Sequence, residues 1–209
     1  STTLPEPDNP RRPAALDDRE IGWLVGLYLA EGSHGERSVQ LAGHVDERER
    51  FGRLRRIAEA FDGSSTWHET GGKASVVQLR GRVVDAVVAT YVGGRNAHDK
   101  HLRPAAWRRS NVFLRAVAEG YLEGDGSRDE TNDRWRLGFC RNDRLASDLR
   151  TLAARLGASA IIHATHVDGF GETWPAYRGD WKWTRGEQHN VKADAEIVHI
   201  GRSRARQFW

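Results

Sequence analysis

The pattern of apolar positions first predicts a buried helix near the start of the chain. Asp17 and Glu20 have the spacing of a capping box, in which side chains three positions apart satisfy free amide groups of a first helical turn. The run 21–30 that follows is apolar apart from two glycines. A helix that is apolar on every side is a core helix, so we predict that this helix is buried.

Segments with other periods come after this helix. Residues 38–44 (SVQLAGH) and 134–140 (RWRLGFC) alternate apolar and polar positions, which is typical of half-buried strands. Each precedes a segment with apolar residues at helical spacing, at 51–61 and at 145–156. A hairpin and a third helix at 83–91 then complete the series in the first part of the chain.

This series begins twice, because the phrase VGLYLAEGS at 25–33 returns as AEGYLEGDGS at 118–127. The offset is 94 residues (125−31 = 94), and residue size and charge are kept along it. The matched positions are Gly22, Gly26, Ala30, Glu31, Gly32 and Ser33 in the first copy, and Ala116, Gly120, Gly124, Asp125, Gly126 and Ser127 in the second. Such a repeat predicts two related structural units.

We therefore predict an α+β fold with two pseudo-symmetric halves, joined by two central packed helices. The first half is expected at 17–110 and the second at 111–209, after an extended, proline-rich arm at 1–16. EIVHIG (196–201) aligns with SVVQLR (75–80) at an offset of 121, which predicts an insertion of about 27 residues (121−94) in the second half.

This insertion is expected at about 167–194, as a hairpin with an aromatic core formed by Trp181 and Trp183 and a basic outer face that includes Lys182. The same alignment places Trp209 within the opening turns of the last helix of the second half, so we expect this helix to be cut short. The sequence contains no methionine, as expected of a segment of a longer product or of a processed chain.

The repeated glycines have a chemical consequence. Residues four apart lie on one helix face, so each copy has a stripe that is nearly free of side chains, and two such stripes can meet backbone to backbone. Helices packed in this way would bring Glu31 and Asp125 side by side. Neighbouring carboxylates raise each other's pKa unless a cation lies between them, and divalent metals at such sites hydrolyse phosphodiesters. The alternative is ordinary tight packing with both acids facing water.

The two phrases resemble the paired motifs of the LAGLIDADG homing endonucleases, in the single-chain form that carries both copies. GYLEGDGS (120–127) is a strong match, and LVGLYLAEG (24–32) differs by having Leu29 where the family name has its first aspartate. The resemblance extends over nearly the whole chain from Leu16. It implies αββαββα halves with saddle-shaped antiparallel sheets in the major groove of DNA, and cleavage of both strands across the minor groove to leave short 3′ overhangs.

The resemblance also implies roles for single residues. Glu31 and Asp125 are expected to bind Mg²⁺ or Mn²⁺ and to position the hydrolytic water, with Ca²⁺ binding without supporting cleavage. Lys100, 25 residues before Asp125, stands where the family places a lysine that stabilises charge on the phosphate. Its alternative is a solvated surface lysine, and the second half contains no clear counterpart for it.

Polar positions on the outer sheet faces are candidates for contacts with double-stranded DNA, since arginine pairs with guanine and glutamine with adenine. An ordinary solvated face is the alternative. The candidates are Arg37, Gln40, Gln78, Arg80, Arg134, Arg136, Lys182 and His199.

Composition agrees with this interpretation. The net charge is +3, and only four of the 32 basic residues are lysines, so a polyanionic partner is expected. Cys140 is the sole cysteine, which excludes an internal disulfide and favours a reducing cytoplasmic location. No apolar stretch is long enough to cross a membrane, and the histidines lack the spacing of a zinc site.

The sequence thus predicts a monomeric, metal-dependent endonuclease that makes double-strand breaks at a long asymmetric DNA site. The ending RARQFW resembles the return to the splicing domain in intein-borne enzymes, although this chain lacks the residues needed for splicing. Two alternatives remain: a DNA- or RNA-binding protein on the same scaffold without cleavage, such as a maturase or regulator, and an unrelated hydrolase with paired carboxylates that acts, for example, on a sugar.

Overall fold

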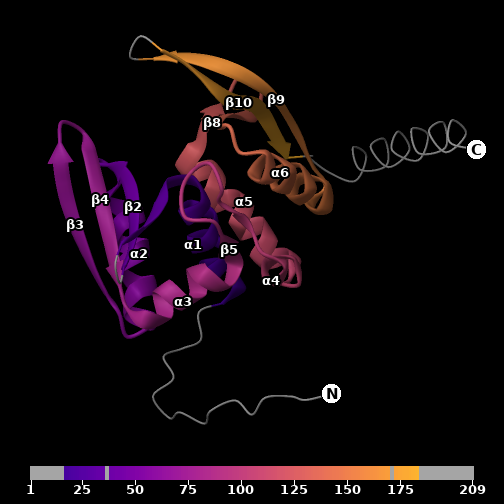
Figure 1. The fold of residues 1–209 in the computed structure, drawn as a ribbon. Helices are drawn as coiled ribbons and strands as arrows, with labels where there is room; N and C mark the ends of the chain where they lie inside the picture. Colours follow the sequence, from indigo (N-terminus) through magenta and orange to yellow (C-terminus); the bar gives the residue numbers. More distant parts are fainter. Residues whose placement is uncertain (1–16, 36–37, 170–171, 184–209) are drawn as a thin grey trace, which may run out of the picture. The chain divides into compact units, whose positions relative to one another are not determined.

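The computed structural model describes residues 17–35, 38–169 and 172–183, and these form two compact units that divide between Asp125 and Gly126 (Figure 1). The boundary between the units comes after the helix that contains the second motif, because that helix packs on the helix that contains the first motif. The repeat boundary at 110/111 remains a prediction about sequence relationship.

The first unit contains one αββαββα series, in the order predicted from the sequence. Its four-stranded antiparallel sheet has the strand order β1-β2-β4-β3. The elements are α1 (Asp18–Glu31), β1 (Gly32–Gly35), β2 (Ser38–His44), α2 (Arg48–Ala60), β3 (Ser64–Gly71), β4 (Ala74–Arg80) and α3 (Arg82–Tyr91).

One face of this sheet is covered by helices (Figure 1). Val39 and Leu41 on β2 and Leu79 on β4 are buried against these helices, as the alternation of the strands predicts. The positions between them, including Gln40 and Gln78, lie on the opposite face. The sheet therefore has an apolar side that fixes its register and a polar side that remains available for a ligand.

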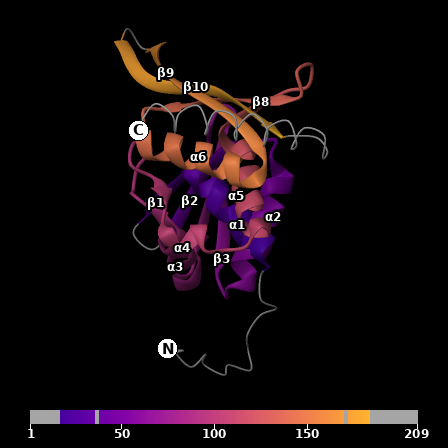
Figure 2. The same cartoon turned by 90° about the vertical axis from the view of Figure 1, so that its right-hand side faces the viewer.

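A short segment then leads to the second motif helix. It contains the two-stranded pair β5 (Val92–Gly93) and β6 (His101–Leu102) and the single turn α4 (Pro104–Trp107), and it is followed by α5 (Asn111–Asp125). α1 and α5 lie side by side (Figures 1 and 2). The predicted pair of packed central helices is confirmed.

Glycine allows these two helices to approach closely. A Cβ atom at Gly22, Gly26 or Gly120 would fall less than 3.0 Å from a backbone carbonyl oxygen of the opposite helix. The oxygens belong, in the same order, to Phe113, Val117 and Trp23. Positions from Gly22 to Ala30 therefore meet positions from 113 to 124 in ascending order. The helices run parallel, so their C-terminal ends lie together.

The second unit contains a second sheet with the corresponding strand order β7-β8-β10-β9. Tyr177 lies opposite Phe139, and Trp181 lies opposite Trp135, in the apolar layer of this sheet. α6 packs on β9. The elements are β7 (Gly126–Asp129), β8 (Arg134–Cys140), α6 (Asp143–Leu156), β9 (Ala158–Gly169) and β10 (Glu172–Trp183).

The expected insertion at 167–194 is wrong in its described part. β10 pairs with β8 just as β4 pairs with β2, so 172–183 takes the sheet position that the sequence alignment gave to 196–201. The two strands of the β9–β10 hairpin are longer than β3 and β4. The sequence alignment therefore placed the last strand of the second sheet too far along the chain. The aromatic core of the hairpin is present, since Trp181 is fully buried and Lys182 is exposed. Residues 196–201 lie outside the described residues.

Candidate active site and nucleic-acid surface

Glu31 and Asp125 are the last residues of α1 and α5. A Cβ atom added at Gly124, the neighbour of Asp125, would lie 3.2 Å from Cγ of Glu31. Burial first, and then the charge of Asp125, raises the pKa of the Glu31 carboxyl. The parallel packing thus brings both half-buried carboxylates to one end of the helix pair.

Asp125 is the more strongly perturbed acid. Burial raises its pKa to about 6, against the opposing effects of a hydrogen bond from the Tyr121 hydroxyl at 3.2 Å and of the charge of Lys100. The carboxylate is therefore held in a poorly solvated position at neutral pH, where a cation would stabilise it. Raised pKa values of this kind are typical of functional sites.

Lys100 lies beside these carboxylates but is turned to the backbone. Its Nζ donates to the carbonyl oxygens of Tyr28 and Gly32 at 3.0 Å each, and to that of Ala30 at 3.4 Å. The residue is 2% exposed, so the alternative of a solvated surface lysine is wrong. The charge of Lys100 lowers the pKa of both acids against the effect of burial.

Arg50 is a cation at this site that sequence analysis missed. Its Nη2 donates to the carbonyl oxygen of Glu123 at 2.5 Å, and its Nη1 donates to Oε2 of Glu47 at 2.6 Å. The sequence signal is weak, because one arginine among several in an amphipathic helix looks like part of a solvated face. Only its hydrogen bond from α2 to the end of α5, a tertiary contact, distinguishes it.

The carboxylate pair fits a hard divalent cation. Mg²⁺ is usually held by one or two carboxylates and completes its coordination with water and substrate phosphate oxygens. Glu31 and Asp125 provide such a pair, with pKa values raised by burial in a site where a cation would compensate their charge. Within the described part of the chain no set of three or more His, Cys, Asp or Glu side chains is arranged to hold a metal, so no closed structural site is found there.

The outer face of the first sheet carries three of the residues predicted to contact DNA. Gln40 and Gln78 are directly opposite each other on β2 and β4. Gln78 donates to Ser38 Oγ at 2.9 Å and accepts from Arg80 Nη2 at 2.8 Å. The exposed Arg80 is thereby tied to its own strand, which reduces the number of conformations available to it.

In the second unit, the predicted arginines are held by acids. Asp129 Oδ2 accepts from Arg134 Nε at 3.1 Å and from Arg136 Nη2 at 2.9 Å, and Arg134 also donates to Asp180. Hydrogen bonds from Asn132 first, and then from the two arginines, hold the pKa of Asp129 far below its ordinary value. A base or phosphate would have to compete with Asp129 for these arginines.

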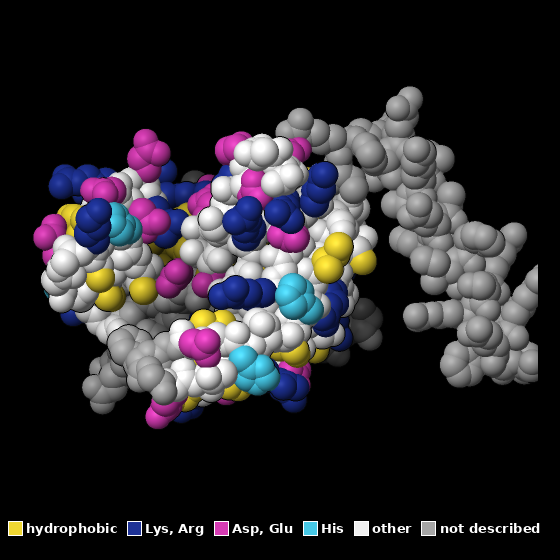
Figure 3. Space-filling model, turned by 90° about the horizontal axis from the view of Figure 1, so that it is seen from above, with side chains coloured by type: hydrophobic (Ala, Val, Ile, Leu, Met, Phe, Trp, Pro, Cys, Tyr) yellow, Lys and Arg dark blue, Asp and Glu magenta, His cyan; other side chains and the backbone are white. Residues whose placement is uncertain are grey.

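The remaining candidates differ in what the structure says of them. Lys182 and the neighbouring Arg178, which sequence analysis missed, are both exposed on β10. Figure 3 shows basic, acidic and histidine side chains interspersed on the face that it presents. Arg37 and His199 lie outside the described residues, so their predicted DNA contacts remain predictions.

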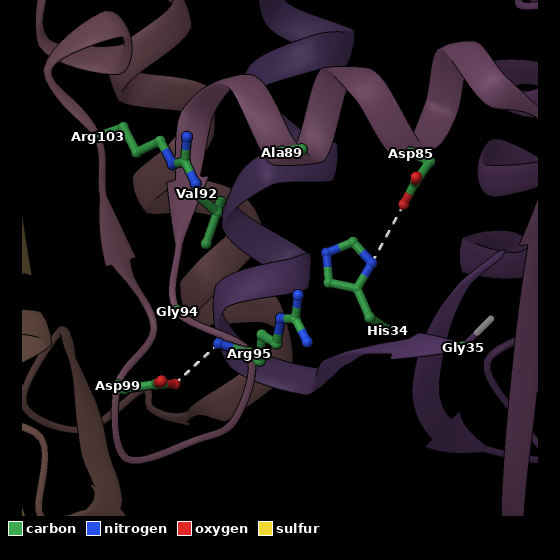
Figure 4. A pocket seen from close by; sticks show the side chains of 9 residues that line it. All are labelled: His34, Gly35, Asp85, Ala89, Val92, Gly94, Arg95, Asp99 and Arg103. Atoms are coloured by element: carbon green, nitrogen blue, oxygen red, sulfur yellow. Dashed lines mark hydrogen bonds and ion pairs between the residues drawn. The ribbon is translucent and has the colours of Figure 1, made fainter. Parts of the chain in front are cut away.

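A polar pocket lies on the first unit, between β1, α3 and the segment 94–103 (Figure 4). His34 Nδ1 is 3.1 Å from Asp85 Oδ1, and Asp99 Oδ1 accepts from the backbone N–H of Arg95 at 2.9 Å. Arg103 also lines the pocket. Its two acids are thus engaged by a histidine and by a loop backbone, so the arrangement resembles a hydrogen-bonded loop anchor more than a catalytic site.

Solved structures identify the fold. The homing endonuclease I-DmoI in complex with DNA and Ca is 12% identical, with a TM-score of 0.54 over 84% of this chain and 86% of that chain. I-DmoI in complex with DNA and Mn is 13% identical, with a TM-score of 0.52 over 84% and 93%. Full-length DUF199/WhiA from Thermatoga maritima is 10% identical, with a TM-score of 0.52 over 91% and 63%.

Curated relatives give a different kind of similarity. The iron-sulfur cluster assembly SufBD family protein Rv1461 of Mycobacterium tuberculosis is 26% identical over 164 residues, as is its counterpart Mb1496 of Mycobacterium bovis. The match covers 73% of this chain but only about a fifth (19%) of each relative.

No family model matches the chain. The helices of the described residues include none that is long and apolar enough to span a bilayer. The strand order of both sheets, the parallel motif helices and the similarity to I-DmoI together show that this chain has the LAGLIDADG homing endonuclease fold in its two-motif form.

Proposed function

We propose that the protein is a site-specific endonuclease that makes metal-dependent double-strand breaks in a long, asymmetric DNA target. The observation that carries this proposal is the pair Glu31 and Asp125, two half-buried carboxylates at the adjacent ends of parallel helices. A protein that only binds DNA gains nothing from carboxylates that are desolvated beside each other and that repel phosphates. Fold alone would be a weaker argument, because one fold serves many functions.

Each part of the site has a stated role in this proposal. A divalent cation bound there would polarise the phosphate and lower the pKa of an attacking water. Glu31 and Asp125 would hold and orient that cation as carboxylates, while Lys100 and Arg50 secure the backbone around them. The outer sheet faces supply Gln40, Gln78 and Arg80 for contacts to base edges and phosphates.

The second candidate is a DNA-binding protein without cleavage. The similarity to DUF199/WhiA favours keeping it, because that protein contains a LAGLIDADG domain and is not named as an endonuclease. The two candidates make the same prediction for salt-dependent affinity for duplex DNA and differ in strand cleavage.

The test is selection of cleaved molecules from a randomised duplex pool with Mg²⁺ or Mn²⁺, followed by assay of the selected duplex. We expect cleavage of both strands by the wild-type protein and loss of cleavage, with retained binding, in Glu31→Gln and Asp125→Asn. Binding without cleavage by the wild-type protein in either metal would favour the second candidate.

We also propose that the chain is the endonuclease region of an intein. The match to a fifth of the length of SufBD family proteins supports this, since an inserted element of a host protein would give a match of that extent. Iron-sulfur cluster assembly is not proposed for this chain. Splicing would have to be tested in the longer host protein that contains it.

A further inference from the structure

The C-terminal ends of the two motif helices, α1 and α5, share an electrostatic problem. The last carbonyl groups of a helix have no partner within it, and the helix dipole concentrates partial negative charge there. At the ends of α1 and α5 this charge lies next to Glu31 and Asp125. The arrangement is electrostatically unfavourable unless cations are nearby.

Lys100 meets this need at the end of α1. An ammonium group has three N–H donors, and three carbonyl oxygens of the segment 28–32 accept from it, at 3.0, 3.4 and 3.0 Å. The acceptors surround Glu31 in sequence. Because all three donors are directed at the backbone, Lys100 would have to leave these carbonyls to donate to a phosphate.

Arg50 meets the same need at the end of α5. Its guanidinium bridges the Glu123 carbonyl oxygen, two residues before Asp125, and the carboxylate of Glu47. Glu47 Oε2 also accepts from the backbone N–H of His44 at 2.8 Å, which anchors this carboxylate to the end of β2. The Arg50 side chain is 17% exposed; its hydrogen bond to Glu47 is partly buried, and its hydrogen bond to Glu123 lies at the surface.

We propose that Arg50 and Lys100 are a matched pair of positioning residues, each fixing the C-terminal turn that presents one carboxylate of the active site. Arg50 is thus the counterpart of Lys100, although it comes from α2 of the first half and is an arginine. The inference rests on the proposed function for its catalytic meaning, while its structural part stands on the contacts alone.

Arg50 and Lys100 both come from the first half of the chain. This explains why the second half needs no lysine equivalent to Lys100. Both cations belong to the same compact unit as the two carboxylates. The charge of Arg50 and that of Lys100 both act on Glu31, lowering its pKa against burial. The hydrogen bonds, in contrast, divide between the two helix ends, because Lys100 donates to carbonyl oxygens of the segment 28–32 and Arg50 to that of Glu123. Losing the hydrogen bonds of either cation should therefore loosen one helix end more than the other, and this asymmetry can be measured.

The experiment is amide hydrogen exchange by NMR on the metal-free full chain, for Arg50→Met, Lys100→Met and the control Arg55→Met. Arg55 is on the same helix as Arg50 but is exposed and pairs with Glu59. We expect Arg50→Met to accelerate exchange at Gly124 and Asp125 at least tenfold and to spare Ala30 and Glu31. Lys100→Met should give the reverse pattern, and Arg55→Met neither.

Conservative variants keep the test decisive if a methionine variant unfolds. Arg50→Lys retains the charge but lacks the fork that reaches both Glu47 and Glu123, so we expect an intermediate acceleration confined to the end of α5. Unchanged exchange, or equal acceleration at both helix ends, would overturn the proposal.

Catalysis supplies the second measurement. On the selected duplex, Arg50→Met and Lys100→Met should each lower kcat about tenfold or more, the usual effect of losing a group that orients a metal ligand, with KM within about twofold. A loss that appears only in KM would overturn the positioning role. If the wild-type protein cuts no duplex, the proposed function fails, while the exchange pattern still tests the positioning of the two turns.

Discussion

Gly26 and Val117 are in backbone contact across the two motif helices. A Cβ atom at Gly26 would fall less than 3.0 Å from the carbonyl oxygen of Val117 and 2.8 Å from the amide nitrogen of Tyr121. No rotamer change relieves a clash with backbone. The separation of the helices, and with it the position of Glu31 relative to Asp125, is therefore set by the absence of a side chain at this position.

Substitution at this contact should destabilise the protein. We expect Gly26→Ala to lower the free energy of unfolding by about 1–3 kcal/mol, the usual effect of overpacking. Gly52→Ala is the matched control, because Gly52 also lies within a helix but a Cβ there meets only the Arg56 side chain at 3.8 Å. That control should stabilise by about 0.5–1 kcal/mol. Chemical denaturation of both variants checks the sign of each change.

The raised pKa of Asp125 predicts a dependence of stability on pH. A carboxyl whose pKa is raised in the folded state favours folding at low pH, and this contribution is lost as pH rises through about 6. Metal-free Asp125→Asn should therefore be more stable than the wild-type protein at pH 8, by about 1 kcal/mol after allowance for solvent, and equal to it near pH 4. Melting curves at the two pH values measure this, and a constant difference would contradict it.

Asp129 should restrain binding to DNA. It holds Arg134 and Arg136, so Asp129→Asn is expected to release two arginines for phosphates. Affinity for random duplex DNA should rise, and the slope of log K against log salt should steepen by about one unit for each arginine that engages a phosphate. Titrations at several salt concentrations test this. A variant that folds normally but binds more weakly would show that Asp129 orients the arginines for DNA.

Much of the fold follows from local patterns. The capping of α1 is confirmed, since Asp17 Oδ1 accepts from Glu20 N at 2.9 Å. Alternation and helical spacing predict β2, α2, the β3–β4 hairpin and α3, whereas β1 is expected only from the family resemblance. The insertion was placed wrongly because strand length leaves no periodic signal that separates a long hairpin from an added one. β10 could be assigned only through its pairing with β8.

The candidate site could be predicted in part. The repeat at one offset links Glu31 to Asp125 and so predicts their adjacency, whereas at that offset Arg50 matches only Arg144, another arginine of an amphipathic helix. The contact between Arg50 and Glu123 joins α2 to the end of α5, which is a tertiary property that no local pattern shows. The prediction for Lys100 gave its neighbourhood correctly, but not that its donors are directed at backbone carbonyls.

In the proposed function, Glu31 and Asp125 share a divalent cation. Electron paramagnetic resonance titration with Mn²⁺ of the wild-type protein, Glu31→Gln, Asp125→Asn and the double variant tests it most directly. If the two residues share a cation, each single change should weaken Mn²⁺ binding about tenfold or more, and the double variant should bind little worse than the weaker single variant. Additive losses, or single variants that bind Mn²⁺ as the wild-type protein does, would contradict the claim.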